Sequence, residues 1–250
     1  MNDSSVQGWE DFYSPEMDGS AQAVKVTVTT AGKITANVGG VALSGTGFDG
    51  FKDGVYSVAL KKTQKITSGK LKGGSKVWEL HLEIGPDSAW DSRQLFGWYN
   101  VYTIDKNGLA SMTPYLAVAA QRNAFAADDD AKAVAATVVA SGKKGAKGFV
   151  VTKAYDEDYV YTLDCADCAL GGAKAAVAAT AKANGTVSLA GTIAKTKVSG
   201  SAVLEVLPDA EGEPARTATA RFFTSKFVIE VVYVIEDGEV VEAYGRVWGK

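Results

Sequence analysis

Apolar and polar residues alternate along much of the chain, and this period of two predicts β-strands. Residues 77–84 alternate most clearly, with tryptophan, leucine and isoleucine on one face and Glu79, His81 and Glu83 on the other. Residues 55–60 follow the same pattern. Each segment is expected to turn one face towards a core and the other towards solvent.

Two further stretches predict strands and a tight turn. Residues 96–104 carry aromatic residues on both faces, as expected of a strand that is covered on both sides. Residues 221–235 and 240–248 flank the sequence Glu-Asp-Gly-Glu, and Asp-Gly is a strong signal for a two-residue hairpin. The C-terminal third is therefore predicted to be a meander.

The chain also resembles itself, which is the most informative feature of the sequence. Residues 24–48 read VKVTVTTAGKITANVGGVALSGTGF, and residues 177–204 read VAATAKANGTVSLAGTIAKTKVSGSAVL. Gly32 aligns with Gly185. The other aligned positions are Val26, Val28, Ile34 and Ala36 with Ala179, Ala181, Val187 and Leu189, and, after a two-residue insertion, Ser44-Gly45 with Ser199-Gly200. Either the segment is duplicated, or two unrelated hairpins share the same turn chemistry. Because residues 177–183 align with a predicted strand of the first copy, Ala-rich residues 173–183 are expected to be strand rather than helix.

One region breaks the alternation and predicts a helix. Residues 113–141 are rich in alanine, three aspartates precede an apolar stretch, and Gly142 follows it. Aspartate at the start and glycine after the end are typical of helix termini. We expect a helix over residues 129–140 and another turn or two over residues 115–125.

The expected fold is mainly β: an antiparallel meander that closes into a barrel or forms packed sheets, built from two similar halves with a short helical connector near residues 115–141. The expected organisation is an N-terminal extension (1–23), a first β half (24–112), the connector (113–147) and a second β half (148–250). The halves form one compact domain or two small β-barrels.

Composition excludes several classes of function. The 250 residues include 26 Lys and Arg against 29 Asp and Glu, a net charge of −3, and we expect no sustained basic run and no nucleic-acid partner. A single histidine, His81, excludes zinc sites built on several imidazoles. No apolar run is long enough to span a membrane, and no catalytic residue, cofactor or metal is assigned.

Cys165 and Cys168 have the spacing of redox motifs and of half a zinc site. They follow a predicted strand rather than opening a helix, and the other ligands that zinc would need are missing. A local disulfide or two idle thiols are therefore favoured.

Two groups of acidic residues are candidate sites. Asp128, Asp129 and Asp130 lack the alternate spacing of a calcium loop and are expected to start a helix. His81 lies between two glutamates on one strand face, where acid–base chemistry is conceivable, although a solvated polar face explains the same residues.

Aromatic residues are the best candidates for ligand binding. Trp78 is expected in the core, whereas Trp90 lies in a polar loop and Trp98-Tyr99 lie on a strand beside polar residues. Flat rings next to hydrogen-bonding side chains can stack on sugars, so Trp90, Trp98 and Tyr99 are candidate carbohydrate contacts.

The segments TTAGKITANVGGVALSGTGF and ANGTVSLAGTIAKTKVSGSAVL resemble the Gly-, Lys- and Thr-rich β-meander modules of large secreted or surface bacterial proteins, over about a third of the residues. The resemblance implies a non-catalytic, exported module for adhesion, spacing or ligand capture, and it carries over no functional residue. The sequence lacks a signal peptide, so an exported protein would be represented by its mature part or an excised domain.

We therefore expect a structural or interaction module of a secreted or surface bacterial protein, located outside the cell or on its surface, with a glycan or another surface protein as its partner. A carbohydrate-binding module is the first alternative. A carboxylate-dependent hydrolase is the second, and it requires a cleft with two facing carboxylates.

Overall fold

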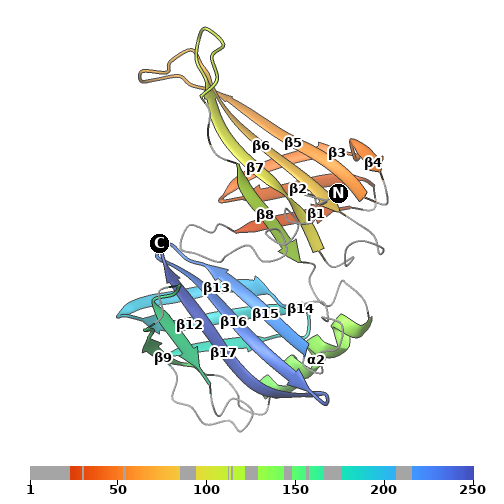
Figure 1. Cartoon of the computed structure of the whole chain (residues 1–250), viewed down its shortest axis with the longest axis vertical. Helices are drawn as coiled ribbons and strands as arrows, with labels where there is room; N and C mark the ends of the chain where they lie inside the picture. The colour runs from red at the N-terminus through yellow and green to blue at the C-terminus, as the bar shows by residue number, and fades with distance from the viewer. Residues whose placement is uncertain are drawn as a thin grey trace, which may run out of the picture. The chain divides into compact units, whose positions relative to one another are not determined.

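The computed structural model (Figure 1) describes residues 23–29, 31–52, 55–84, 94–111, 113, 115–121, 129–143, 148–155, 158–165, 176–206 and 216–250. These residues form antiparallel strands and one α-helix, so the prediction of a mainly β fold is confirmed. They divide into two compact units, Ala23–Ala120 and Gln121–Lys250, each described by itself below.

The first unit contains two antiparallel sheets whose strands are adjacent in chain order. The smaller sheet is a three-stranded meander, and the larger sheet has five strands. The strands are β1 (Val24–Val28), β2 (Lys33–Val38) and β3 (Val41–Thr46), followed by β4 (Gly50–Lys52), β5 (Val55–Lys65), β6 (Ser75–Ile84), β7 (Gln94–Ile104) and β8 (Leu116–Gln121).

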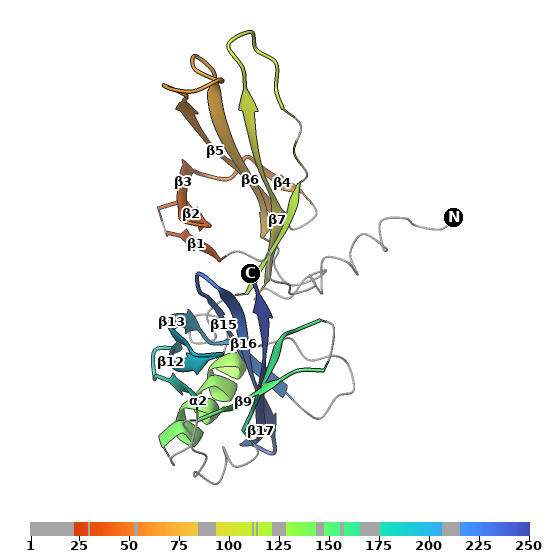
Figure 2. The same cartoon turned by 90° about the vertical axis from the view of Figure 1, so that its left-hand side faces the viewer.

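The two sheets lie face to face, as Figure 2 shows from the side. Their facing apolar residues form one core. Ile34 of β2, Leu60 of β5 and Leu80 of β6 are at most 1% exposed within this core. Trp78 is also buried in it. The alternation in residues 77–84 therefore correctly predicted both a strand and its inner face.

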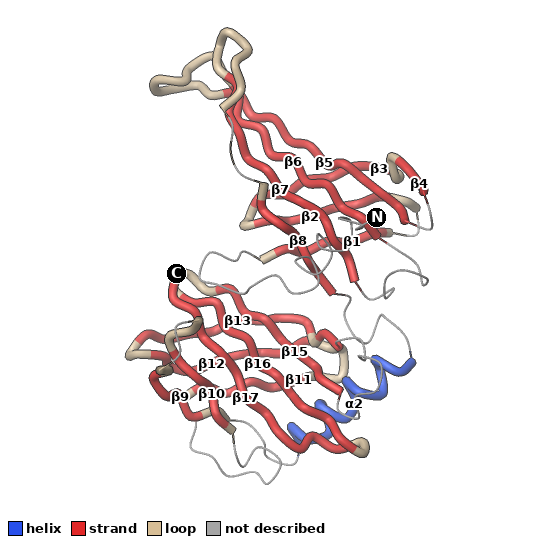
Figure 3. The backbone as a smooth tube through the Cα atoms, viewed as in Figure 1, coloured by secondary structure: helices blue, strands red, loops and turns tan. Residues whose placement is uncertain are grey.

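The second unit joins another three-stranded meander to a six-stranded sheet and the helix. The elements are α2 (Asp129–Lys143), β9 (Val150–Lys153), β10 (Tyr161–Asp164), β11 (Val177–Ala181), β12 (Thr186–Ile193), β13 (Thr196–Val203), β14 (Glu205–Val206), β15 (Arg216–Phe223), β16 (Phe227–Glu236) and β17 (Glu239–Gly249). The larger sheet runs β14-β15-β16-β17-β10-β9, so β10 pairs with the C-terminal strand although it precedes the meander in the chain (Figure 3).

Helix α2 is part of the core of the second unit. Its buried residues Ala131, Val134 and Val138 recur at helical spacing and pack with residues of both sheets. Asp129 and Asp130 occupy its first turn, where Asp129 pairs with Lys132 at 3.1 Å and Asp130 pairs with Arg216. The helix predicted over residues 129–140 is confirmed.

The two meanders have the same turn and the same strand register. Gly32 and Gly185 have φ angles of +77° and +75°, and the N–H of each donates to the carbonyl three residues earlier at 2.9 Å. In both meanders the residue six before the glycine faces the residue four after it. Residues 177–181 are strand, as expected from the repeat.

The predicted alignment after these turns is wrong by two residues. In the first meander Ser44 faces Thr35, the third residue after Gly32. In the second meander the third residue after Gly185 is Ser188, and it faces Ser201 rather than the predicted Ser199. Both strands of the second hairpin are two residues longer, which makes the insertion four residues rather than two.

Three other expectations are wrong for the described residues. Of the two arrangements expected, the closed barrel is wrong and packed sheets are found, because the meander and the larger sheet of each unit pack face to face. The turn or two of helix expected within residues 115–125 is wrong for residues 116–121, which form β8; the pairing of β8 with β7 outweighs the helix propensity of its alanines. The single strand expected over residues 221–235 is interrupted at Thr224, where β15 turns into β16.

Candidate functional site

An aromatic cluster lies on the face of the five-stranded sheet that points away from the core of the first unit. His81 on β6 and Trp98 on β7 are directly opposed, and their rings stack at 3.7 Å with an interplanar angle of 17°. Tyr115, just before β8, meets Trp98 edge to face at 4.7 Å and 79°. We call His81, Trp98 and Tyr115 the aromatic cluster.

Gly97 brings the two strands of this cluster close together. A Cβ atom at position 97 would lie 1.9 Å from the carbonyl oxygen of His81, closer than any real contact. Since only glycine fits, β7 approaches β6 closely beside the ring of Trp98. The stacked pair is thus fixed by backbone packing as well as by the rings themselves.

Exposure differs sharply within the cluster. Tyr115 is 61% exposed, whereas the side chains of His81 and Trp98 are partly buried. The imidazole covers one face of the indole, so the accessible aromatic surface is mainly the ring of Tyr115. A ligand on this face would contact the ring of Tyr115, which packs edge to face against the indole of Trp98.

A polar network flanks the cluster on the same sheet face. The Tyr102 hydroxyl donates to Glu79 Oε1 at 2.9 Å, and Lys61 Nζ lies 2.6 Å from the same oxygen. The hydrogen bond from Lys61 lowers the pKa of Glu79, and the same bond raises the pKa of Lys61. Glu79 is therefore held as a carboxylate next to the row of His81 and Trp98.

The structure places two of the three predicted carbohydrate contacts, Trp98 and Tyr99, on opposite faces of the sheet. Trp98 lies on the outer face, but Tyr99 points the other way into the core, is 4% exposed, and has its pKa raised by burial. Trp90 lies outside the described residues. Trp98 and Tyr99 are therefore not brought together on one surface.

Cys165 is buried at the end of β10, with its sulfur 2.7 Å from the carbonyl oxygen of Gly148. It carries no free thiol. Cys168 lies outside the described residues, so its pairing with Cys165 stays a prediction.

A charged network occupies the outer face of the six-stranded sheet in the second unit. Arg221 on β15 binds Glu205 at 3.0 Å and Glu230 at 3.1 Å, and Arg246 on β17 lies 3.9 Å from Glu230. Burial raises the pKa of Glu205 to about 7; Arg221 lowers it, and Glu230 raises it. These carboxylates share a guanidinium, which marks an internal ion-pair network. They line neither the pocket beside α2 nor the one over β2 and β3.

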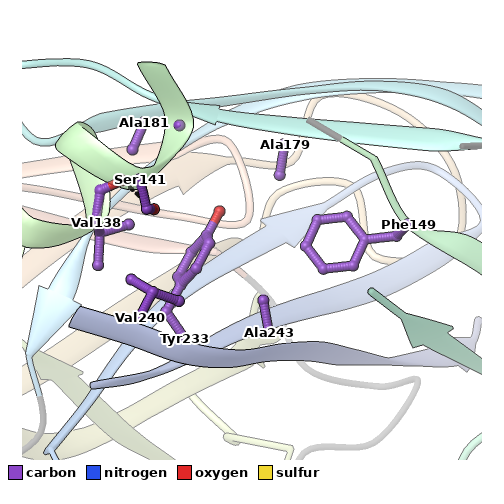
Figure 4. A pocket seen from close by; sticks show the side chains of 9 residues that line it. Val138, Ser141, Phe149, Ala179, Ala181, Tyr233, Val240 and Ala243 are labelled. Atoms are coloured by element: carbon purple, nitrogen blue, oxygen red, sulfur yellow. Dashed lines mark hydrogen bonds between the residues drawn. The ribbon is translucent and has the colours of Figure 1, made fainter. Parts of the chain in front are cut away.

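The enclosed cavity of the second unit is too small for an organic ligand. It lies between α2 and the sheets and provides about 10 Å³, roughly the space of one water. Tyr233 projects across it towards Ala179 and Ala181, and Val138 and Ser141 lie beside them (Figure 4). Burial raises the pKa of the Tyr233 hydroxyl, in keeping with a packing role.

Sequence reasoning missed two features. The sequence predicts a helix at Tyr115 and a solvated face at His81, because the contact of both with Trp98 depends on strand pairing and is not visible in a local pattern. The expectation of no sustained basic run also overlooked residues 61–76, which contain six interspersed lysines and no acidic residue. A local charge count would have found this segment.

No protein-family model matches the chain, and no curated protein and no solved structure matches it. Within the described ranges, no group of three or more His, Cys, Asp or Glu residues is placed to hold a metal ion. The same ranges contain no helix long and apolar enough to cross a membrane.

Proposed function

We propose that this chain is a non-catalytic interaction module of a secreted or surface bacterial protein, and that the aromatic cluster is its binding surface. The observation that carries the proposal is the 61% exposure of Tyr115 beside a stacked His81–Trp98 pair. A large aromatic side chain that is exposed and held in place is typical of binding surfaces, because little conformational entropy is lost on binding.

Two further features support this role. Each unit is a rigid scaffold of packed sheets, on which side chains of the outer face keep a fixed spacing. Cys165 has no free thiol, which is usual for proteins of oxidising compartments and favours a location outside the cell or on its surface.

We propose that the two equivalent meanders arose by duplication of one segment, which their shared turn and register support.

A carbohydrate is the partner that the cluster fits best, with another surface protein as the alternative. The ring of Tyr115 offers a flat face for a sugar, while His81 and the exposed Glu83, two residues further along β6, supply hydrogen-bonding groups. This revises the contacts expected from the sequence: Trp98 supports Tyr115, and Tyr99 serves the core.

A glycan array tests the proposal. The unmodified protein is expected to bind a restricted set of glycans, and Tyr115→Ala is expected to lose binding at least tenfold, about 1.4 kcal/mol. Trp98→Ala should weaken binding similarly by releasing Tyr115. Tyr155→Ala is the matched control, since Tyr155 is fully exposed in the second unit.

Two results would contradict the carbohydrate assignment. One is silence across a broad array; the other is glycan binding that survives Tyr115→Ala and Trp98→Ala. If the array is silent, binding is measured to bacterial surfaces stripped of glycans. Binding by the unmodified protein that Tyr115→Ala and Trp98→Ala both lose would favour a protein partner.

A further inference from the structure

The hairpin of β5 and β6 carries an unusual concentration of positive charge. Residues 61–76 contain six lysines and no acidic residue, in a chain whose net charge is −3. The six, all exposed, are Lys61, Lys62, Lys65, Lys70, Lys72 and Lys76.

Most of these lysines have no carboxylate partner among the described residues. Of the six lysines, Lys61 forms an ion pair, with Glu79, while Lys62 and Lys76 lie 5.9 and 5.2 Å from the ring centre of Trp78. The described residues provide no ion pair to Lys70 or Lys72. Their charges face solvent.

A second loop lies against the end of this hairpin. Residues 66–74 connect β5 to β6, and residues 105–109 follow β7; Figure 3 shows the two loops beyond the ends of these strands. A Cβ atom on Gly73 would lie 3.6 Å from Cβ of Lys106, so the loops are in contact. Lys106 is exposed, and its charge is balanced within the loop by Asp105, so the six lysines of the hairpin carry the net positive charge.

Hydrogen bonds to backbone N–H groups give both loops a defined shape. Lys72 N–H donates to the Gly69 carbonyl at 3.1 Å, which places Lys70 and Leu71 at the apex of a turn. In the second loop, Asp105 Oδ1 accepts from the Leu109 N–H at 2.9 Å. The apex side chains are therefore presented by ordered turns.

Each loop also exposes a leucine. Leu71 is 44% exposed and Leu109 is 71% exposed. The two leucines lie in loops that touch, and exposed lysines lie in the same two loops. We call Lys65, Lys70, Leu71, Lys72, Lys106 and Leu109 the basic tip.

We propose that the basic tip binds the surface of an anionic lipid membrane, with Leu71 and Leu109 entering the interface and the lysines meeting lipid phosphates. Lysines near an anionic bilayer add electrostatic attraction, and apolar side chains at the same edge gain by leaving water. The contact is peripheral and adds to the proposed role of the aromatic cluster. His81 lies six residues along β6 from Ser75, about 20 Å by the usual strand rise, so the two surfaces are separate.

The leucines favour a membrane over a soluble polyanion. A nucleic acid or acidic polymer would use the lysines but would offer the two leucines nothing to enter. Neither loop contains an aromatic residue on which bases could stack.

Vesicle co-sedimentation of the full chain tests the proposal. At physiological ionic strength we expect binding to mixed phosphatidylglycerol and phosphatidylcholine vesicles and little binding to pure phosphatidylcholine. Since each lysine contributes roughly fivefold, Lys70→Gln with Lys72→Gln should weaken binding about 25-fold. Leu71→Ser with Leu109→Ser should weaken it at least tenfold, and circular dichroism should show an intact fold because both side chains are exposed.

Controls separate this tip from other surfaces. Lys195→Gln with Lys197→Gln removes the same charge from exposed positions in the second unit and should leave vesicle binding unchanged. Trp98→Ala should also leave it unchanged, so failure of the aromatic proposal and failure of this one can be told apart.

Three outcomes would overturn the proposal. They are absence of binding to phosphatidylglycerol vesicles, equal binding to both vesicle types, and undiminished binding by the leucine variant. Tighter binding to duplex DNA or polyphosphate than to vesicles, insensitive to the leucines, would likewise show a polyanion site in place of a membrane site.

Discussion

Replacing Glu205 by glutamine should change how the stability of the second unit depends on pH. Glu205 is largely buried on β14 and shares Arg221 with Glu230. Burial, the largest cause, raises its pKa from the ordinary 4.5 to about 7. Glutamine keeps the size of the side chain and can still accept a hydrogen bond from Arg221, but it cannot ionise.

The direction in which stability changes with pH follows from the linkage between protonation and folding. Because the pKa of Glu205 is higher in the folded than in the unfolded chain, the stability that its protonation contributes is complete below pH 4.5 and is lost as the pH rises to 7. A difference between 4.5 and about 7 corresponds to about 3 kcal/mol. The free energy of unfolding of Glu205→Gln, relative to the unmodified protein, should therefore rise by about 3 kcal/mol between pH 4 and pH 8.

Amide hydrogen exchange in β15 and β16 is the suitable assay, because two units need not unfold in one transition. Exchange rates are corrected for the intrinsic effect of pH before the unfolding free energies are compared. Glu242→Gln, an exposed carboxylate on β17, matches the change in charge. If the profiles of Glu205→Gln and the unmodified protein run parallel from pH 4 to pH 8, the reasoning about Glu205 is wrong.

Three shorter predictions concern the scaffold. In urea denaturation, Gly97→Ala should destabilise the first unit by about 3 kcal/mol or more, since the new Cβ would overlap the backbone of β6. The control Gly142→Ala, with open space around its Cβ, should be neutral or stabilising. Ala194→Asn with Lys195→Gly should stabilise the second unit by about 1 kcal/mol. Both residues have positive φ angles, 45° and 64°, in a two-residue hairpin turn that favours Asn-Gly. An unchanged denaturation midpoint would contradict this. Thiol titration of the denatured protein should find Cys165 unreactive until a reductant is added, and reaction without reductant would disprove the disulfide.

Much of the scaffold could be predicted from local pattern. Alternation in residues 77–84 identified β6 and its buried face, and Asp237-Gly238 identified the β16–β17 turn, where both residues have positive φ. Asp129 at the start of the Ala-rich segment identified helix α2. These features are set by neighbours within a few residues, which is why a single sequence reveals them.

The candidate site depended on information that a local pattern lacks. Trp98 and Tyr99 are adjacent and equally aromatic, and only the packing of the meander decides that Tyr99 faces the core. Tyr115 joins Trp98 because β8 pairs with β7, against the helix propensity of its alanines. The basic tip was hidden for another reason: acidic residues elsewhere make the net charge of the chain negative.

The most direct test of the central claim is ¹⁹F NMR of the 5-fluorotryptophan protein, titrated with glycans. Trp98→Phe assigns the resonance of Trp98 among the five tryptophans. If the aromatic cluster is the binding surface, the Trp98 resonance shifts saturably and Tyr115→Ala abolishes that shift. A glycan that shifts other tryptophan resonances while that of Trp98 stays fixed, or a Trp98 signal that no glycan moves, would contradict the account.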